Sequence, residues 1–266
     1  MGQDATMTNL LSLNGRVALV TGGGRGIGRG ISEALAAQGA AVAVNYRKDA
    51  DAAAATVAAI RDAGGDAEAF QCSVDSWDDC QRLSDAVIER FGFVDILIHN
   101  AGIASRGHVV ADTDPLEMER VVRAHAFGPH YLSKLLVPQM RVRDRGDVVM
   151  ISSISTSNNT GGGAPYNMGK AALEALAFTL AKEERNNGIR VNVVAPGLVV
   201  SDMGRRLAKA TTGFDDIHKL DKSSPFGHVC TPDDVARVVL MFVSDLGSYV
   251  TGQRVVVDGG GYLPRP

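Results

Sequence analysis

The chain has 266 residues, of which 45% are hydrophobic and 21% are charged, and its formal net charge is -3. This size and composition predict a sizeable buried core and, by default, one large domain. The slight negative charge and the interspersed signs argue against a surface for nucleic acid or anionic membrane, and no apolar run reaches the roughly 20 residues of a membrane span.

Residues 1–13 are polar at first and lack the basic and then apolar pattern of a signal peptide, so we expect a flexible lead-in. The three cysteines, Cys72, Cys80 and Cys230, form no CxxC pair and cannot all pair within the chain. Such cysteine usage is typical of a reducing compartment. We therefore expect a cytoplasmic protein with a single domain over residues 14–266.

Short β-branched runs alternate with longer alanine-rich stretches of helical periodicity along this domain. The alternation predicts an α/β fold in which helices cover both faces of a parallel sheet. Runs such as Val17-Ala18-Leu19-Val20 fit strands that are buried on both sides. The predicted strands are 16–20, 41–45, 67–71, 95–99, 147–151, 190–194 and 254–257, and the predicted helices are 26–38, 49–63, 76–91, 114–140, 165–185 and 232–244.

One long stretch, residues 199–231, shows no clear periodicity and is rich in Gly, Ser, Thr and Lys. It follows a predicted strand end, and open α/β sheets bind ligands beyond the carboxyl ends of their strands. Irregular segments of this length are usually functional or disordered. We interpret 199–231 as a substrate lid, with an ordinary surface excursion as the alternative.

A glycine-rich turn joins the first predicted strand to the first predicted helix and reads Thr21-Gly22-Gly23-Gly24-Arg25-Gly26-Ile27-Gly28. Glycines let the backbone approach a pyrophosphate closely, and a helix N-terminus offers free N–H groups with a partial positive charge. A glycine-rich loop alone can be only a tight turn. Its place between strand and helix predicts a dinucleotide site.

The end of the second predicted strand indicates which dinucleotide binds. An acid there would hold the ribose 2′-hydroxyl of NAD, but this chain reads Val44-Asn45-Tyr46-Arg47. Arg47 can instead bind a 2′-phosphate, and Arg25 can reach the same phosphate from the glycine-rich turn. Each arginine alone could be a solvated charge, but together with the missing acid they favour NADP(H).

The catalytic candidates are Tyr166 and Lys170, four residues apart on one face of a predicted helix. A nearby cation favours the phenolate and lowers the pKa of a phenol, which suits proton exchange with an alkoxide. Ser153 stands at the end of a predicted strand, where its hydroxyl can donate to the same substrate oxygen. Taken alone, YxxxK is usually structural and a serine is often a turn cap; the combination favours catalysis.

Over residues 13–260 the chain resembles the short-chain dehydrogenase/reductases, and in pattern the 3-oxoacyl-carrier-protein reductases and secondary-metabolite ketoreductases. The resemblance implies a single doubly wound Rossmann-type domain with seven parallel strands, frequent homotetramers, and Tyr166 as proton donor or acceptor. It also implies that Lys170 binds the nicotinamide ribose, that Asn100, Ala101 and Gly102 line the cofactor, and that residues 196–199 hold the nicotinamide end. The matching residues are Thr21-Gly22 through Gly28, His99-Asn100-Ala101-Gly102, Ser153, Tyr166 with Lys170, Pro196-Gly197 before Val199, Thr251-Gly252-Gln253 and Val257-Asp258-Gly259-Gly260.

Three departures from the family pattern are mild. His99 replaces the first Asn of Asn-Asn-Ala-Gly, while the second Asn remains. Ser73, beside Val74, stands where an Asp commonly meets the adenine, and its hydroxyl can still form a hydrogen bond. Ser201 takes the place of the usual Thr after Pro-Gly and keeps the hydroxyl for the cofactor.

A fourth departure affects catalysis. His125, in His125-Ala126-Phe127-Gly128, stands where the family has an Asn whose backbone carbonyl holds a water of a proton relay. Three outcomes are open: the relay survives through the backbone, the imidazole joins it as a group titrating near neutrality, or catalysis is impaired. The alternative is an alignment error of one turn, with His125 a packed core histidine.

The function that these features predict is NADP(H)-dependent hydride transfer between a carbonyl and an alcohol, with a ketone or a 3-oxoacyl compound as the small-molecule substrate. The competing hypothesis is an NADP(H)-binding or scaffold protein that keeps the fold without turnover. No HExxH, GxSxG or close His/Cys set is present, so no metal site is predicted. Substrate specificity in this fold depends on loops, so the sequence does not name the substrate. It does not give the reaction direction either.

Overall fold

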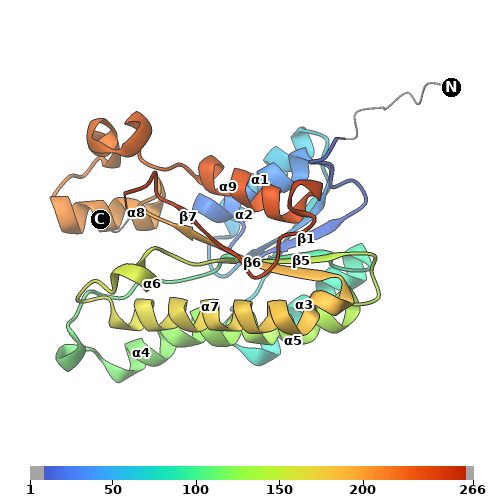
Figure 1. The fold of residues 1–266 in the computed structure, drawn as a ribbon, viewed down its shortest axis with the longest axis horizontal. Coiled ribbons are helices and arrows are strands. Elements are labelled where there is room, and N and C mark those ends of the chain that lie inside the picture. The colour runs from blue at the N-terminus through green and yellow to red at the C-terminus, as the bar shows by residue number, and fades with distance from the viewer. Residues whose placement is uncertain (1–8, 262–266) are drawn as a thin grey trace.

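A seven-stranded, all-parallel sheet forms the centre of the molecule in the computed structural model, which describes residues 9–261 (Figure 1). The strand order is β3-β2-β1-β4-β5-β6-β7, so the direction of winding reverses between β1 and β4. Ligand sites of doubly wound sheets lie at such a switch point, beyond the carboxyl ends of the strands. The predicted sheet is confirmed, with strands at Val17–Val20, Ala41–Tyr46, Ala67–Gln71, Ile96–His99, Gly146–Ile151, Ile189–Pro196 and Arg254–Val257 (β1 to β7).

Helices cover both faces of this sheet and bury two separate cores. On one face α1, α2 and α9 pack against one set of strand side chains, including Ala18 and Val20. On the other face α3, α5 and α7 pack against the alternate set, including Leu19 (Figure 1). Because the strands are covered twice, their side chains are apolar on both faces. These helices span Gly26–Ala37 (α1), Ala50–Asp62 (α2), Trp77–Phe91 (α3), Gly128–Met140 (α5), Ala164–Glu184 (α7) and Pro232–Val243 (α9).

The predicted helix 114–140 is wrong in one respect, because the structure divides it into two α-helices. α4 (Pro115–Val122) and α5 are joined by a π-helical turn at Arg123–Phe127, where the Gly128 N–H bonds to the Arg123 carbonyl. A π-turn inserts one extra residue, and such turns are frequent at functional sites. Periodicity alone does not reveal it, since both halves keep a helical pattern.

The stretch 199–231 is more regular than its sequence predicts. It contains α8 (Asp202–Thr212), which the Ser201 side chain caps, and 3₁₀ turns at Ile217–Ser223 and Pro225–Gly227. Its two ends meet in a parallel bridge between Val199 and Cys230. The segment is therefore a closed excursion from the carboxyl end of β6. A short helix, α6 (Ser155–Asn158), follows β5 and was also not predicted.

The predicted lead-in over residues 1–13 is too long at its far end. Leu13 is fully buried in the core, and Leu11 packs against the same cluster. The packed chain thus starts before residue 14, while residues 1–8 lie outside the described part. Within the described part, no helix has the length and apolarity needed to cross a membrane.

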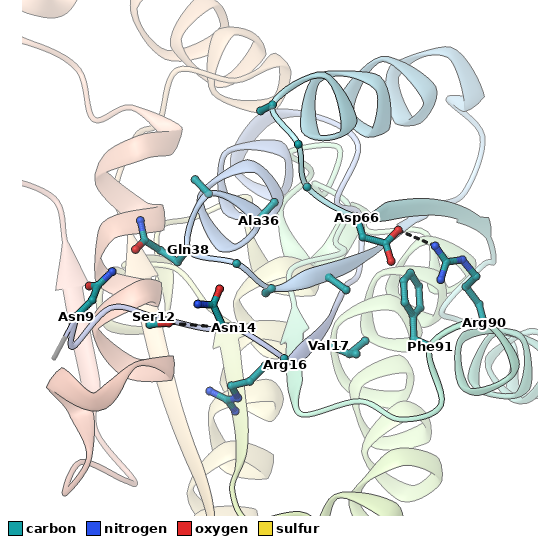
Figure 2. A pocket seen from close by; sticks show the side chains of 18 residues that line it. Asn9, Ser12, Asn14, Arg16, Val17, Ala36, Gln38, Asp66, Arg90 and Phe91 are labelled. Carbon is teal, nitrogen blue, oxygen red and sulfur yellow. Dashed lines mark hydrogen bonds and ion pairs between the residues drawn. The ribbon is translucent and has the colours of Figure 1, made fainter.

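A groove of about 700 Å³ lies at the amino-terminal end of β1 and β2, between the start of the described chain and α3 (Figure 2). Its charged side chains are already paired, as Arg90 with Asp66 and Arg16 with Asp147. None of the predicted site residues lines it. This groove is at the opposite end of the sheet from the candidate active site.

Candidate active site

The glycine-rich turn brings the start of α1 against the end of β4. Gly22 has φ of 62°, and a Cβ on it would lie 3.2 Å from the Ala101 Cα; a Cβ on Gly28 would collide with the Gly22 carbonyl. The Asn100 amide donates to the carbonyls of Thr21 and Gly22 at 2.9 and 3.1 Å. Four predicted cofactor residues, Gly22, Asn100, Ala101 and the following Gly102, thus lie together at the switch point.

The N-terminus of α1 is open to an anion. Arg25 is the N-cap residue and makes no side-chain cap, so no side chain satisfies the first N–H groups of the helix. A Cβ on Gly26 would lie 3.4 Å from the Ser201 Cβ, and the same residues border a cavity of about 300 Å³. Ile27 points inward and packs against the core. An uncapped helix start without a Cβ at the turn fits a dinucleotide pyrophosphate.

The two arginines expected at the 2′-phosphate have different partners. Arg25 lies 3.4 Å from Asp49 and 3.8 Å from Asp202, and all three side chains are about half exposed. Exposed pairs of this kind contribute little stability, so Arg25 can exchange them for another anion. Arg47 is exposed at the end of β2. Asn45 is occupied structurally, since its side chain bonds to Gly22 and to the carbonyls of Phe70 and Cys72.

The remaining cofactor candidates line the same edge of the sheet. The Ser73 hydroxyl donates to Asp75 at 2.5 Å, and the Val74 carbonyl is 2.5 Å from where a Gly128 Cβ would lie. Pro196 ends β6, and a Cβ on Gly197 would touch Asp258 after β7. Val199 is buried, and its carbonyl accepts from the Ser201 hydroxyl at 3.3 Å.

The catalytic candidates come from the end of β5 and the first turns of α7. The Lys170 ammonium is buried and donates at 2.6 Å to the carbonyl of Ile151, the last residue of β5, which the serine pair follows. Its Nζ lies 5.8 Å from the centre of the Tyr166 ring. Ser153, Tyr166 and Lys170 are therefore brought together as their spacing predicts.

The electrostatics of the pair differ from the expectation. Burial raises the pKa of the Tyr166 phenol, and only its hydrogen bond with Ser153 lowers it. Burial also lowers the pKa of the Lys170 ammonium to about 7, against the opposing effect of the Glu174 carboxylate. In this structure the pKa of Tyr166 therefore lies above its ordinary value, whereas the sequence predicts a lowered one, because desolvation outweighs the hydrogen bond with Ser153.

His125 occupies the middle of the π-turn and reaches the catalytic tyrosine. Its imidazole is 1% exposed, stands edge-on to the Tyr166 ring at 5.1 Å, and its Nε2 lies 2.8 Å from the Ile103 carbonyl. A Cβ on Gly102 would lie 2.4 Å from the ring, so the imidazole needs a glycine there. His125 is thus both a packed histidine and a neighbour of Tyr166, readings that the sequence treats as alternatives.

Burial, reinforced by the Lys170 charge, lowers the pKa of His125 to about 3. An imidazole with that pKa is neutral throughout the range in which enzymes work. This shift argues against the outcome in which His125 titrates near neutrality. Its Nδ1 is buried without a hydrogen-bond partner among the described residues.

A polar cluster behind Ser153 escaped the sequence analysis. Glu174 on α7 and Arg254 on β7 form an ion pair of 2.9 Å, and Arg254 also donates to the Ser153 carbonyl at 3.2 Å. The one available signal was Glu174 itself, a carboxylate one helical turn beyond Lys170. Among residues 9–261 no cluster of His, Cys, Asp and Glu could hold a metal ion.

Comparison with known proteins adds to this geometry. Residues 22–261 match the protein family described as enoyl-(acyl carrier protein) reductase. The chain is 37% identical to the versicolorin reductase of Emericella nidulans, over 94% of this chain and 97% of that protein. It is 35% identical to a 3-oxoacyl-[acyl-carrier-protein] reductase of Staphylococcus epidermidis, over 92% of this chain and 98% of that protein.

The chain belongs to the short-chain dehydrogenase/reductase family. Among solved structures, a 7α-hydroxysteroid dehydrogenase in complex with NADH and 7-oxoglycochenodeoxycholic acid superimposes with a TM-score of 0.85 at 31% identity. The match covers 95% of this chain and 96% of that one. As a short-chain dehydrogenase/reductase, the protein is an oxidoreductase of a family that binds nicotinamide cofactors.

Proposed function

We propose that this oxidoreductase reduces a ketone or 3-oxoacyl group to the alcohol with NADPH, and that Ser153, Tyr166 and Lys170 carry the proton transfer. The observation behind the proposal is the half-buried Tyr166 next to the buried Lys170, beside Ser153 at the carboxyl end of β5. Perturbed titratable groups in one place at a switch point are typical of active sites.

The residues present fit the cofactor along its whole length. The uncapped N-terminus of α1 and Gly22 accommodate the pyrophosphate, Arg25 and Arg47 would bind the 2′-phosphate, and Ser73 with Val74 would meet the adenine. The remaining predicted contacts with the cofactor would come from Gly26, Ile27, Asn100, Ala101, Gly102, Tyr166, Lys170, Pro196, Gly197, Val199 and Ser201.

In the proposed reaction the reduced nicotinamide, when bound, supplies the hydride to the carbonyl carbon. Tyr166 donates its hydroxyl proton to the carbonyl oxygen, and the Ser153 hydroxyl donates a hydrogen bond to the same oxygen as charge develops there. Tyr166, whose pKa burial raises, is protonated at neutral pH, which is the form from which a proton donor must start. Lys170 then stabilises the phenolate that remains on Tyr166.

His125 acts in this scheme as a neutral packing residue. Its imidazole contacts the Ile103 carbonyl and the edge of the Tyr166 ring, and its backbone lies in the π-turn. We infer that the relay survives through the backbone and that catalysis is retained.

The test is NADPH oxidation with a panel of 3-oxoacyl thioesters, ketones derived from hydroxynaphthalenes, and oxosteroids, classes that the relatives' names suggest. We expect turnover on at least one class, with a loss of about 10²- to 10⁴-fold in kcat/KM for Tyr166→Phe. Tyr249→Phe is the matched control, because Tyr249 is fully exposed. Tight NADPH binding with no turnover on any member would instead support a scaffold protein.

Three further expectations accompany this function. Residues 199–231 act as a lid over the substrate, since both ends of the segment are joined beside the nicotinamide end of the site. The protein forms a homotetramer, as its family often does, which light scattering would test. The protein resides in the cytoplasm. Free cysteines support this expectation, because they are typical of a reducing compartment, and burial raises the pKa of the Cys230 thiol to about 11.

A further inference from the structure

One carboxylate oxygen gathers three donors behind the catalytic serine. Oε1 of Glu174 accepts hydrogen bonds from Ser152 Oγ at 2.5 Å, Thr156 Oγ1 at 2.9 Å and Arg254 Nε at 2.9 Å. The Glu174 and Arg254 side chains are 13% and 20% exposed. Hydrogen bonds to a partly buried charge are stronger than neutral ones and hold their partners in fixed geometry.

Arg254 extends this cluster to the backbone of the catalytic serine. Its second guanidinium nitrogen donates to the Ser153 carbonyl at 3.2 Å and to Thr156 Oγ1 at 2.9 Å. The Ser153 carbonyl lies 3.0 Å from Thr156 Oγ1, whose single proton is shared between this carbonyl and Glu174 Oε1. Thus β7, at the edge of the sheet, holds the turn that orients the Ser153 hydroxyl, although about a hundred residues separate the two in sequence.

Glu174 also stands one helical turn after Lys170, on the same side of α7. The other groups that face the ammonium are Tyr166 on α7, neutral His125 from the π-turn, and the Ile151 carbonyl on β5. Arg254, on β7, lies beyond Glu174. Of these groups, Glu174 supplies the negative charge that favours the protonated form of Lys170.

We propose that Glu174 and Arg254 are positioning residues of the proton-transfer site: Arg254 holds the Ser153 turn in place, and Glu174 both anchors Arg254 and keeps Lys170 charged. The catalytic part of this inference rests on the proposed reduction. The electrostatic part does not, because Lys170 titrates whether or not a carbonyl is turned over.

The test is Glu174→Gln, which removes the charge and keeps an oxygen for the three donors. We expect the alkaline inflection of kcat/KM for reduction to move about one pH unit lower, with the dissociation constant of NADPH little changed at pH 6. Glu183→Gln is the matched control, since Glu183 is exposed near the end of the same helix. A fall in kcat without movement of the inflection would overturn the electrostatic role.

A second readout does not depend on turnover. NMR of protein labelled at the lysine side chains, with the Lys170 signal identified by its loss in Lys170→Arg, should give a Lys170 pKa about one unit lower in Glu174→Gln. An unchanged Lys170 titration would overturn the proposal even if the substrate panel showed no activity. If Glu174→Gln is poorly folded, the double variant with Glu174→Gln and Arg254→Gln removes both charges. The Lys170 pKa of the double variant should lie between the values for the wild type and for Glu174→Gln.

Arg254→Gln tests the other half of the pair. We expect kcat to fall about tenfold with the KM for NADPH unchanged, because the Ser153 turn loses its anchor. The alkaline inflection should not move to lower pH, because the Glu174 charge remains and a neighbouring positive charge is lost. An unchanged kcat would contradict the positioning of Ser153 by Arg254.

Discussion

The two ends of the sheet differ in the groups that pair with their buried charges. At the amino-terminal end, Asp147 is 1% exposed and binds Arg16 and Arg190, each at 2.7 Å, and Asp95 pairs with Arg143. At the carboxyl end, the buried ammonium of Lys170 has a backbone carbonyl as its hydrogen-bond acceptor. Burial shifts the pKa at both ends, raising that of Asp147 and lowering that of Lys170, but arginines bind the buried carboxylate whereas the buried ammonium is only weakly paired and is available for chemistry.

Replacing the cation at the carboxyl end should have the largest effect on activity. Lys170→Met keeps the length of the side chain and removes the charge that stabilises the Tyr166 phenolate, so we expect kcat/KM to fall about 10²- to 10⁴-fold. Steady-state NADPH oxidation measures it, with Lys182→Met, on the exposed side of α7, as the control. A loss of less than tenfold would break the contrast between the two ends.

The reverse pattern is expected at the amino-terminal end. Asp147→Asn leaves Arg16 and Arg190 without their carboxylate and should lower the free energy of unfolding by about 3–5 kcal/mol, while kcat of the folded enzyme stays within twofold. Urea denaturation measures the first quantity and initial rates the second. Asp245→Asn, at an exposed pair with Arg145, should cost less than about 1 kcal/mol.

The pH dependence of stability should also distinguish the carboxyl end of the sheet, where Lys170 lies, from the amino-terminal end. Lys170 has a pKa of about 7 in the folded protein, below its unfolded value, so between these values the unfolded chain binds more protons and stability rises with pH. The cost of burying the ammonium is complete below pH 7 and declines above it. Relative to Lys170→Met, the wild type should gain up to about 1.4 kcal/mol per pH unit from pH 7 to 9. A constant difference across that range would mean that Lys170 keeps its ordinary pKa.

A smaller effect is expected at the cofactor end, where the charges are exposed. Arg25→Ala or Arg47→Ala should weaken NADPH binding about tenfold, or about 1.4 kcal/mol, and leave NADH binding unchanged. Calorimetric titration with both cofactors measures the ratio, and Arg29→Ala, one turn further along α1, is the control. Equal losses for both cofactors would argue against a 2′-phosphate site.

The smallest effect is expected at His125. His125→Asn keeps the backbone carbonyl and loses the contact of Nε2 with Ile103. Because this contact amounts to about one hydrogen bond, we expect kcat to fall about fivefold. Because His125 is neutral, the rate profile between pH 5 and 9 should keep its shape. A lost inflection near neutrality would show that the imidazole takes part in proton transfer.

The elements that the sequence predicts well are those whose pattern is local. All seven strands and six long helical stretches appear within a few residues of their predicted bounds, since buried strands read as apolar runs and helices keep a period of 3.6. The π-turn at His125 was missed because one inserted residue hardly disturbs that period. α8 was missed because its sequence is rich in charge and contains a glycine, and because only a side-chain cap and few buried residues support the helix.

The chain by itself determined the residue types of the site and their order: the glycine-rich turn, the serine at a strand end, and the tyrosine and lysine four residues apart. Tertiary structure alone decided how strongly each group is desolvated, and hence that Lys170 has a pKa of about 7 and that His125 is neutral. It also decided that Arg254 reaches Ser153 across the sheet. Burial and long-range pairing depend on which distant segments pack together, and spacing within one segment carries no record of that.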